Sequence, residues 1–221
     1  MLEADCRTFI DANTFRQLAV QRLLQIPLDD PAHLDAASDF DLNPDSIPDA
    51  LEAQTNTPLT RAAVLIPIIA RETLTVLLTE RTAHLTAHAG QIAFPGGKIE
   101  LDDANPLDAA LREMHEEIGL SASYIEVLGF LPPYSTGTGF HITPVVALVK
   151  PDFVLNPDPT EVADTFEVPV AFLMDVNNHR IDSRIWRGRE RHFYAMPYEH
   201  RYIWGATAGM IRSLQRRLFE V

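Results

Sequence analysis

A chain of 221 residues with 46% hydrophobic content is long enough to bury one substantial core and to carry an extension. Its 18 lysines and arginines stand against 31 aspartates and glutamates, a formal charge of −13, which argues against nonspecific binding to nucleic acids and to anionic membranes. The sole cysteine, Cys6, excludes an intramolecular disulfide, and no stretch resembles a signal peptide or a membrane span, so we expect a soluble cytoplasmic protein without nucleic-acid or membrane partners.

The N-terminal part is predicted to be an extension of the main domain. Apolar residues such as Phe15 recur at helical spacing between residues 9 and 26, which predicts an amphipathic helix that packs on the rest of the protein. From Pro27 to Pro58 the chain is acidic and punctuated by prolines, which indicates a connection with at most short helical turns. We therefore divide the chain into an N-terminal helix and connection, residues 1–60, and one enzyme-like domain, residues 61–221.

Two strands are predicted at the start of the domain. Residues 62–70 and 74–79 are rich in aliphatic and β-branched side chains, and Arg71-Glu72 supplies a turn between them. The segment 81–90 that follows is polar and rich in histidine. It separates these strands from the best-marked stretch of the chain.

That stretch is a turn followed by a helix, which we expect over residues 106–118. A short strand-like run, Ile92–Phe94, leads into Pro95-Gly96-Gly97, a turn that suits residues with little side-chain bulk. Asn105 is a good N-cap, and Gly119 supplies a left-handed stop at the other end. The apolar positions at helical spacing are Leu107, Ala110, Leu111, Met114 and Ile118.

Three carboxylates share one flank of this helix, away from the apolar stripe. Glu113, Glu116 and Glu117 stand at i, i+3 and i+4, so their charges repel one another. Arg112 can pair with Glu116 and with Asp108, but each such pair contributes only about 0.3 to 0.5 kcal/mol. Carboxylates are the ligands that Mg²⁺ and Mn²⁺ prefer. A solvated acidic helix face is the alternative, but the preceding Gly-Gly turn, the cap and the arginine in register favour a metal site.

The rest of the chain alternates strands and helices. Strands are expected at 125–131 and 141–150, a flexible loop at 132–139, a short helix near 172–175 and a final helix at 207–219. Residues 184–194 are basic and aromatic, with Gly188 at a hairpin turn. Such alternation suggests an α/β fold with a mixed sheet flanked by helices.

The turn and the helix resemble the signature of the Nudix hydrolases, which reads G, five residues, E, seven residues, REUxEExGU. The matching residues are Gly97, Asp103, Arg112, Glu113, Glu116, Glu117 and Gly119. Asp103 stands in place of the first glutamate, and eight residues rather than seven separate it from Arg112. The resemblance implies the Nudix α/β/α sandwich.

A second motif is similar to that of one branch, the coenzyme A diphosphatases. Residues 77–97 resemble LLTxR(S/A)xxxRxxxGxxxFPGG, although Thr82 replaces serine or alanine and Thr86 replaces the second arginine. The resemblance implies hydrolysis of coenzyme A to 4′-phosphopantetheine and adenosine 3′,5′-bisphosphate. The alternatives are a Nudix diphosphatase for ADP-ribose or NADH, and a Nudix-fold binding module without turnover, which the retained glutamates argue against.

The resemblance also suggests roles in catalysis. The expected metal ligands for Mg²⁺ or Mn²⁺ are the carboxylates of Glu113, Glu116 and Glu117 and the carbonyl of Gly97. We expect Glu116 and Glu117 to face the Gly97 loop most directly. Arg112 belongs to the catalytic group, with Asp103 orienting either Arg112 or the loop. Glu161 is the candidate for activating water, and a solvated loop acid is the alternative.

Candidate contacts to a small-molecule substrate lie in two places. Around the Gly-rich turn they are Arg81, His84, His88, Gln91 and Lys98, although a structural role for either histidine is the alternative. Further along the chain, Arg187, Arg189 and Arg191 form the densest basic patch and are candidates for the ribose 3′-phosphate of coenzyme A. The expected assembly is a monomer or a homodimer.

Overall fold

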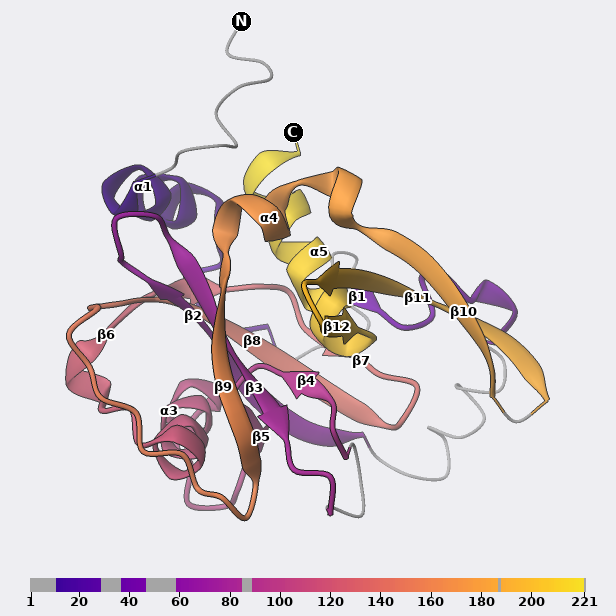
Figure 1. The fold of residues 1–221 in the computed structure, drawn as a ribbon, viewed down its shortest axis with the longest axis horizontal. Coiled ribbons are helices and arrows are strands. Elements are labelled where there is room, and N and C mark those ends of the chain that lie inside the picture. The colour runs from indigo at the N-terminus through magenta and orange to yellow at the C-terminus, as the bar shows by residue number, and fades with distance from the viewer. Residues whose placement is uncertain (1–10, 29–36, 47–58, 85–88, 187, 221) are drawn as a thin grey trace, which may run out of the picture.

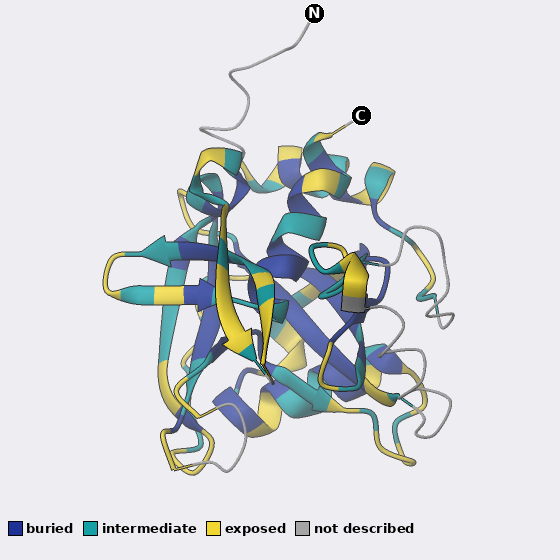
Figure 2. Cartoon of the chain, turned by 90° about the vertical axis from the view of Figure 1, so that its right-hand side faces the viewer, coloured by how far each residue is buried: buried dark blue, intermediate teal, exposed yellow. Residues whose placement is uncertain are grey.

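The strand β2 (Thr60–Ile69) lies at the centre of the protein with both of its faces covered. Because side chains alternate along a strand, Ile66 and Ile68 enter one apolar cluster while Ala63 and Leu65 enter another. The computed structural model describes residues 11–28, 37–46, 59–84, 89–186 and 188–220 (Figure 1). In Figure 2 the strands at the centre are dark blue, which marks their buried residues.

The strands around β2 form the predicted mixed sheet. The strand β8 (Phe140–Val149) runs parallel to β2 from Thr60↔Phe140 to Ile69↔Val149, whereas β3 (Thr75–Arg81) and β5 (Gly96–Lys98) pair with β2 antiparallel. Among the described residues the sheet has nine strands, ordered β1-β7-β8-β2-β3-β4, with β5 on β2, β6 on β8 and β9 on β3. The remaining bounds are β1 Ala37–Ser38, β4 Ile92–Ala93, β6 Ile125–Phe130, β7 Tyr134–Ser135 and β9 Val162–Pro169.

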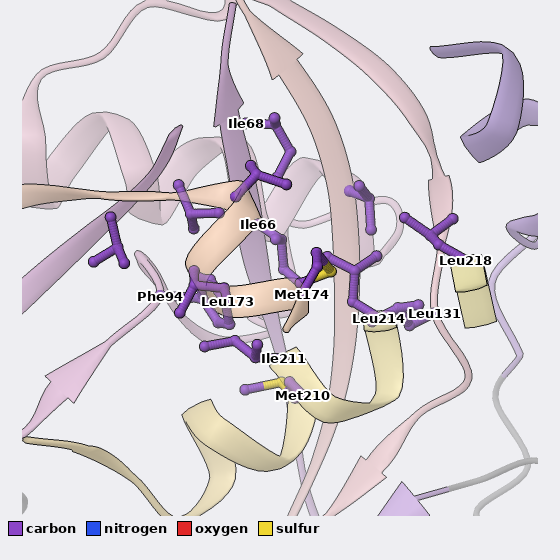
Figure 3. Close-up of a cluster of buried hydrophobic side chains, with 14 of the residues drawn as sticks. Ile66, Ile68, Phe94, Leu131, Leu173, Met174, Met210, Ile211, Leu214 and Leu218 are labelled. Carbon is purple, nitrogen blue, oxygen red and sulfur yellow. The ribbon is translucent and has the colours of Figure 1, made fainter. Parts of the chain in front are cut away.

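Helices cover both faces of this sheet, which gives the predicted α/β/α sandwich. The helix α3 (Pro106–Ile118) packs on one face, and α1 (Ala12–Arg22), α4 (Val170–Met174) and α5 (Ala206–Phe219) share the cluster on the other. Figure 3 shows side chains from β2, α4 and α5 gathered in that second cluster. Short 3₁₀ turns occur at Pro44–Ser46, Ala122–Tyr124 and Val176–Asn178. None of the described helices is long and apolar enough to span a membrane.

A second, three-stranded sheet lies between α4 and α5 in the chain. It consists of β10 (Arg180–Trp186), β11 (Arg189–Tyr198) and β12 (Arg201–Trp204), all antiparallel. The predicted hairpin at Gly188 is confirmed, since Gly188 has φ +76° and Trp186 pairs with Arg189. Met196 and Ile203 of this sheet are buried in the same apolar cluster as the side chains of α5.

The N-terminal helix is an integral part of the core. The predicted helix is confirmed as α1, and its Phe15 and Ala19 are completely buried. Arg16 forms a salt bridge with Glu126 of β6 at 2.7 Å. The boundary near residue 60 remains a prediction.

The loop expected at residues 132–139 is present in part, but its first half is buried rather than a free surface loop. It contains β7, which is buried and pairs with β8 and, in parallel, with β1. Tyr134 explains the order, because its ring packs on Gly209 of α5 and its hydroxyl donates to Asp39 at 2.9 Å. Contacts between segments so distant in the chain have no local signature in the sequence.

Replacing Phe15 with alanine should lower the free energy of unfolding by about 3 to 5 kcal/mol, because a large cavity opens in the core. Urea unfolding of the whole chain measures this change. Val20→Ala is the control, since Val20 lies on the same helix but is exposed, and it should change stability by less than about 0.5 kcal/mol. A Phe15→Ala protein as stable as wild type would show that α1 contributes little to the core.

Candidate active site

The helix α3 presents the predicted carboxylates, and its ends are the predicted ones. The Asn105 side chain accepts the N–H groups of Leu107 and Asp108, and Gly119 ends the helix with φ +70°. Ala109, Ala110, Met114 and Ile118 are completely buried against the sheet. Packing of this stripe sets the rotation of the helix about its axis, and therefore where its glutamates lie.

Glu117 is buried, although the sequence predicts it away from the apolar stripe. Its residue exposure is 4%, because the Gly-Gly turn of β5 covers it. Its Oε2 accepts the backbone N–H of Gly96 at 3.1 Å, and its Oε1 lies 3.4 Å from Nη1 of Arg81. A buried carboxylate needs such partners to offset the loss of hydration. The N–H of Gly96 is a site group that sequence reasoning missed, although the FPGG turn was a signal for it.

Glu113 lies against the other glycine of the turn. A Cβ atom on Gly97 would stand 2.4 Å from Cδ of Glu113, so only glycine allows this approach. The pair that faces the turn is therefore Glu113 and Glu117, four residues apart, rather than the expected Glu116 and Glu117. Glu116 lies further out, with 59% of its side chain exposed.

Arg112 holds the outer part of the cluster. Its Nη1 donates to Glu113 at 2.9 Å and to Glu116 at 3.1 Å, and its Nη2 donates to the carbonyl of Lys98 at 3.1 Å. Both oxygens of Asp103 accept from the same guanidinium, at 3.0 and 2.9 Å. Asp103 thus contacts both of the groups suggested for it, since its Oδ2 also accepts the backbone N–H of Glu100 in the loop at 2.8 Å. The expected pairing of Arg112 with Asp108 is wrong, because Asp108 accepts from Asn105 instead.

A second arginine closes the cluster from β3. Arg81, at the end of that strand, lies between Glu117 and Glu161, with its Nη2 4.0 Å from Oε2 of Glu161. The backbone carbonyl of Glu161 accepts the N–H of Thr82 at 2.9 Å, which fixes the start of β9 beside the end of β3. The structure therefore brings together residues from β3, β5, α3 and the loop before β9.

The electrostatics of the cluster favour a further cation. Burial raises the pKa of Glu117 to about 7, with Glu113 and Glu161 adding repulsion and Gly96 and Arg81 opposing it. Burial likewise raises the pKa of Glu113, against the effect of Arg112. Hydrogen bonding to Arg112 holds the pKa of Asp103 below its ordinary value. The two arginines leave this excess of negative charge only partly compensated.

The donor set suits a divalent cation. Carboxylate oxygens from Glu113, Glu116 and Glu117 and a carbonyl at a turn open to close approach are the hard ligands of Mg²⁺ and Mn²⁺. As they stand, no three Asp, Glu, His or Cys side chains in the described part of the chain converge on one point that holds a metal. Arg112 and Arg81 occupy oxygens of these carboxylates.

The other candidate contacts divide between two regions. His84 and Lys98 are exposed near the turn, and the carbonyl of Gln91 accepts the N–H of Arg81 at 2.9 Å. His88 and Arg187 lie outside the described residues. Arg189 and Arg191 are on β11, and Figure 1 shows their hairpin on the opposite side of the molecule from α3. The structure does not bring this pair together with the glutamates.

Comparisons with known proteins agree with the sequence motif. A family model described as the NUDIX domain matches residues 59–188. The uncharacterized Nudix hydrolase NudL of Enterobacter sp. (strain 638) is 42% identical over 155 residues, which cover 70% of this chain and 80% of that protein. NudL of Escherichia coli (strain K12) is 42% identical over 154 residues, with the same coverage of 70% and 80%.

Solved structures include similar chains at lower identity. The NUDIX domain of Shewanella oneidensis NrtR complexed with ADP ribose has a TM-score of 0.46 and 17% identity, and the match covers 79% of this chain and 96% of that one. A C. elegans Ap4A hydrolase binary complex has a TM-score of 0.42 and 16% identity, covering 53% and 83%.

Alanine at each glycine of the turn should have a different effect. Gly96 has φ +149°, and its Cβ would stand 2.4 Å from the backbone oxygen of Ala63, so Gly96→Ala should lose at least about 1 kcal/mol of stability. Gly97→Ala meets only the flexible end of Glu113, so stability should change little while affinity for Mn²⁺ falls about tenfold. Thermal unfolding and calorimetric titration measure the two effects. Equal loss of stability in both variants would contradict this assignment.

Stability without divalent cations should fall as pH rises from about 4.5 to about 7. In this window folded Glu117 holds a proton that the unfolded chain has released, because its pKa is about 7 in the fold against an ordinary value of 4.5. The contribution is present below pH 4.5 and is lost above pH 7, by up to about 3 kcal/mol. Comparison of wild type with Glu117→Gln in urea isolates it. A difference between the two proteins that does not vary with pH would contradict the prediction.

Proposed function

This chain belongs to the Nudix hydrolase family, whose members hydrolyse diphosphate bonds, and we propose that its substrate is coenzyme A or a coenzyme A derivative. The products would be 4′-phosphopantetheine and adenosine 3′,5′-bisphosphate. The observation that carries this choice is the segment 77–97, which resembles the accessory motif of coenzyme A diphosphatases and contains Arg81, 3.4 Å from Glu117. The substrate is a small metabolite, and we place the enzyme in the cytoplasm.

The chemistry requires neutralisation of charge at phosphorus. A diphosphate ester resists hydrolysis because its negative oxygens repel hydroxide. Nudix hydrolases generally use divalent metal ions, and we propose Mg²⁺ or Mn²⁺ for this chain, held by Glu113, Glu116, Glu117 and the carbonyl of Gly97. When bound, such an ion neutralises phosphate charge and lowers the pKa of water.

The protein's own residues orient this arrangement. Arg112, fixed by both oxygens of Asp103, holds Glu113 and Glu116 at one side of the site. Arg81 stands beside Glu117, and we propose that it donates to a phosphate oxygen of the substrate. Glu161 is exposed and close to Arg81, and we propose that its carboxylate accepts the proton of the attacking water.

Substrate recognition is assigned to two groups of residues. His84, His88, Gln91 and Lys98 flank the turn and are proposed to contact the diphosphate or the pantetheine arm. Arg187, Arg189 and Arg191 are proposed to bind the 3′-phosphate. Since the described hairpin lies away from α3, the second assignment requires a substrate extended across the protein (Figure 1).

One observation favours another substrate. Thr86 stands where the coenzyme A motif has an arginine, so ADP-ribose and NADH are retained as alternative substrates. A binding module without turnover is disfavoured, because the glutamates and the arginine that holds them are all present.

Product analysis distinguishes these candidates. Coenzyme A, dephospho-coenzyme A, ADP-ribose and NADH are each incubated with the protein, with and without Mg²⁺, and the products are separated by chromatography. We expect metal-dependent release of adenosine 3′,5′-bisphosphate from coenzyme A as the fastest reaction. Glu117→Gln should reduce kcat at least about a hundredfold, because it removes a ligand charge in the transition state.

The Arg189→Ala, Arg191→Ala double variant tests the 3′-phosphate assignment. It should lower kcat/KM for coenzyme A by about tenfold to a hundredfold and leave dephospho-coenzyme A nearly unchanged, since a charge-assisted hydrogen bond contributes about 1.5 to 3 kcal/mol. Arg81→Ala is the comparison, as it should slow both substrates. Faster turnover of ADP-ribose or NADH would overturn the coenzyme A proposal but retain the diphosphatase, whereas no turnover of any compound would overturn both.

A further inference from the structure

The second sheet ends in an edge strand with exposed apolar side chains. In the order β10-β11-β12, β10 is terminal, and within the described part of the chain no strand pairs with its outer side. Ile181 is 56% exposed and Ile185 72% exposed on this strand. An edge of this kind is a template for pairing with another strand, and natural proteins usually protect it with like charges, especially lysine, or with proline. Residues 180–186 contain no lysine or proline, and their charged residues, Arg180, Asp182 and Arg184, are of both signs.

The backbone groups of this edge point outward at alternate residues, as contacts of β11 establish. The side chain of Asn43 binds both the N–H and the carbonyl of His192, at 2.8 Å each, so these groups face away from β10. Ser183 is the partner of His192 in the ladder, and in such an antiparallel pair both residues direct their backbone groups away from each other. The N–H and carbonyl of Ser183 therefore point away from β11, toward the outer side of the strand.

The same alternation extends along the strand. The carbonyl of Tyr194 accepts the N–H of Gly205 at 3.1 Å, away from β10, and Tyr194 is the partner of Ile181. Ile181, Ser183 and Ile185 thus offer their backbone groups along the outer edge. An antiparallel partner must present its own outward groups opposite these three residues.

The sequence of β10 is self-complementary in that arrangement. We propose that this edge pairs with β10 of a second copy of the chain, antiparallel about a two-fold axis at Ser183. Ile181 then lies opposite Ile185 of the second copy, and Asp182 lies opposite Arg184 of the second copy, twice by symmetry. The hydrogen-bonding residues face one another, and the two three-stranded sheets become one continuous sheet.

The charged residues of β10 favour this register over the two registers whose axis lies one residue away. An axis at Asp182 would place the two Asp182 residues opposite each other and Arg184 opposite Arg180. An axis at Arg184 would oppose the two Arg184 residues. Like charges directly opposite are destabilising, whereas opposite charges stabilise a cross-strand pair. Of these three axes, only the one at Ser183 satisfies both the backbone and the charges.

Both charged side chains are already held in place. Oδ2 of Asp182 accepts the hydroxyl of Tyr202 at 2.5 Å, which leaves Oδ1 for a partner. The guanidinium of Arg184 lies over the ring of Trp204, with its carbon 4.6 Å from the centroid. Groups ordered before association lose less conformational entropy when they pair.

Sedimentation velocity on the full chain, from about 1 to about 500 µM, tests the proposal. Wild type should show a reversible equilibrium between monomer and dimer. Asp182→Arg and Arg184→Asp each create two like-charge pairs and should raise the dissociation constant about tenfold or more. An equimolar mixture of these two variants restores opposite charges and should form a heterodimer. Ser183→Pro, which removes an outward N–H and spares the β10–β11 bonds, should also weaken the dimer.

Glu72→Arg is the matched control, because it reverses an exposed charge on the β2–β3 turn. It should leave the dissociation constant unchanged, and circular dichroism should show every variant folded. A wild type that stays monomeric throughout the range would overturn the proposal. Equal weakening by Glu72→Arg would assign association to net charge, and failure of the mixture to associate would overturn this register.

Discussion

The buried carboxylate of Glu117 is the constraint on which the site depends. Desolvation of a carboxylate is unfavourable unless donors replace the lost water, and here the donors come from two different strands. Gly96 supplies a backbone N–H from β5, and Arg81 supplies a guanidinium from β3. Both strands pair within the sheet beside β2, so the sheet must be complete before Glu117 has its partners. Folding and site assembly are therefore coupled.

The raised pKa of Glu117 also limits the negative charge of the site. Glu113 approaches the backbone at Gly97, and repulsion from Glu113 and Glu161 helps to keep the pKa of Glu117 high. The five N–H groups of Arg112 are taken by Asp103, two glutamates and the carbonyl of Lys98, so Arg112 orders the cluster but offsets only part of its charge. Uncompensated carboxylates of this kind suit the divalent metal ions that Nudix hydrolases generally use.

The two sheets serve different purposes. The sandwich buries its central strands on both faces and positions the carboxylates. The small sheet is packed on one side only and carries its basic residues away from α3. Its outer strand, β10, is the surface proposed for association, whereas the arginines of β11 are the ones proposed for the substrate.

Much of this arrangement was predictable from local patterns. The bounds of α3, its Asn105 cap and its Gly119 stop, the strands around β2, the hairpin at Gly188 and the α/β/α class follow from periodicity, turn chemistry and a family motif, because each depends on neighbours in the chain. The grouping of Glu113, Glu116 and Glu117 was also predictable from a local pattern, since helical spacing alone places them at adjoining positions.

Other features depended on contacts between distant segments. The burial of Glu117, the choice of Glu113 rather than Glu116 at the turn, and the pairing of Arg112 with Asp103 all require the rotation of α3 on the sheet, which packing of its apolar stripe decides. The order of residues 134–135 needs α5 and β1, and the separation of Arg189 and Arg191 from the glutamates needs the placement of the second sheet. The sequence by itself thus determined the family motif and the candidate site residues, whereas tertiary structure decided which of them meet, because burial and ion pairing depend on groups that only the folded chain brings together.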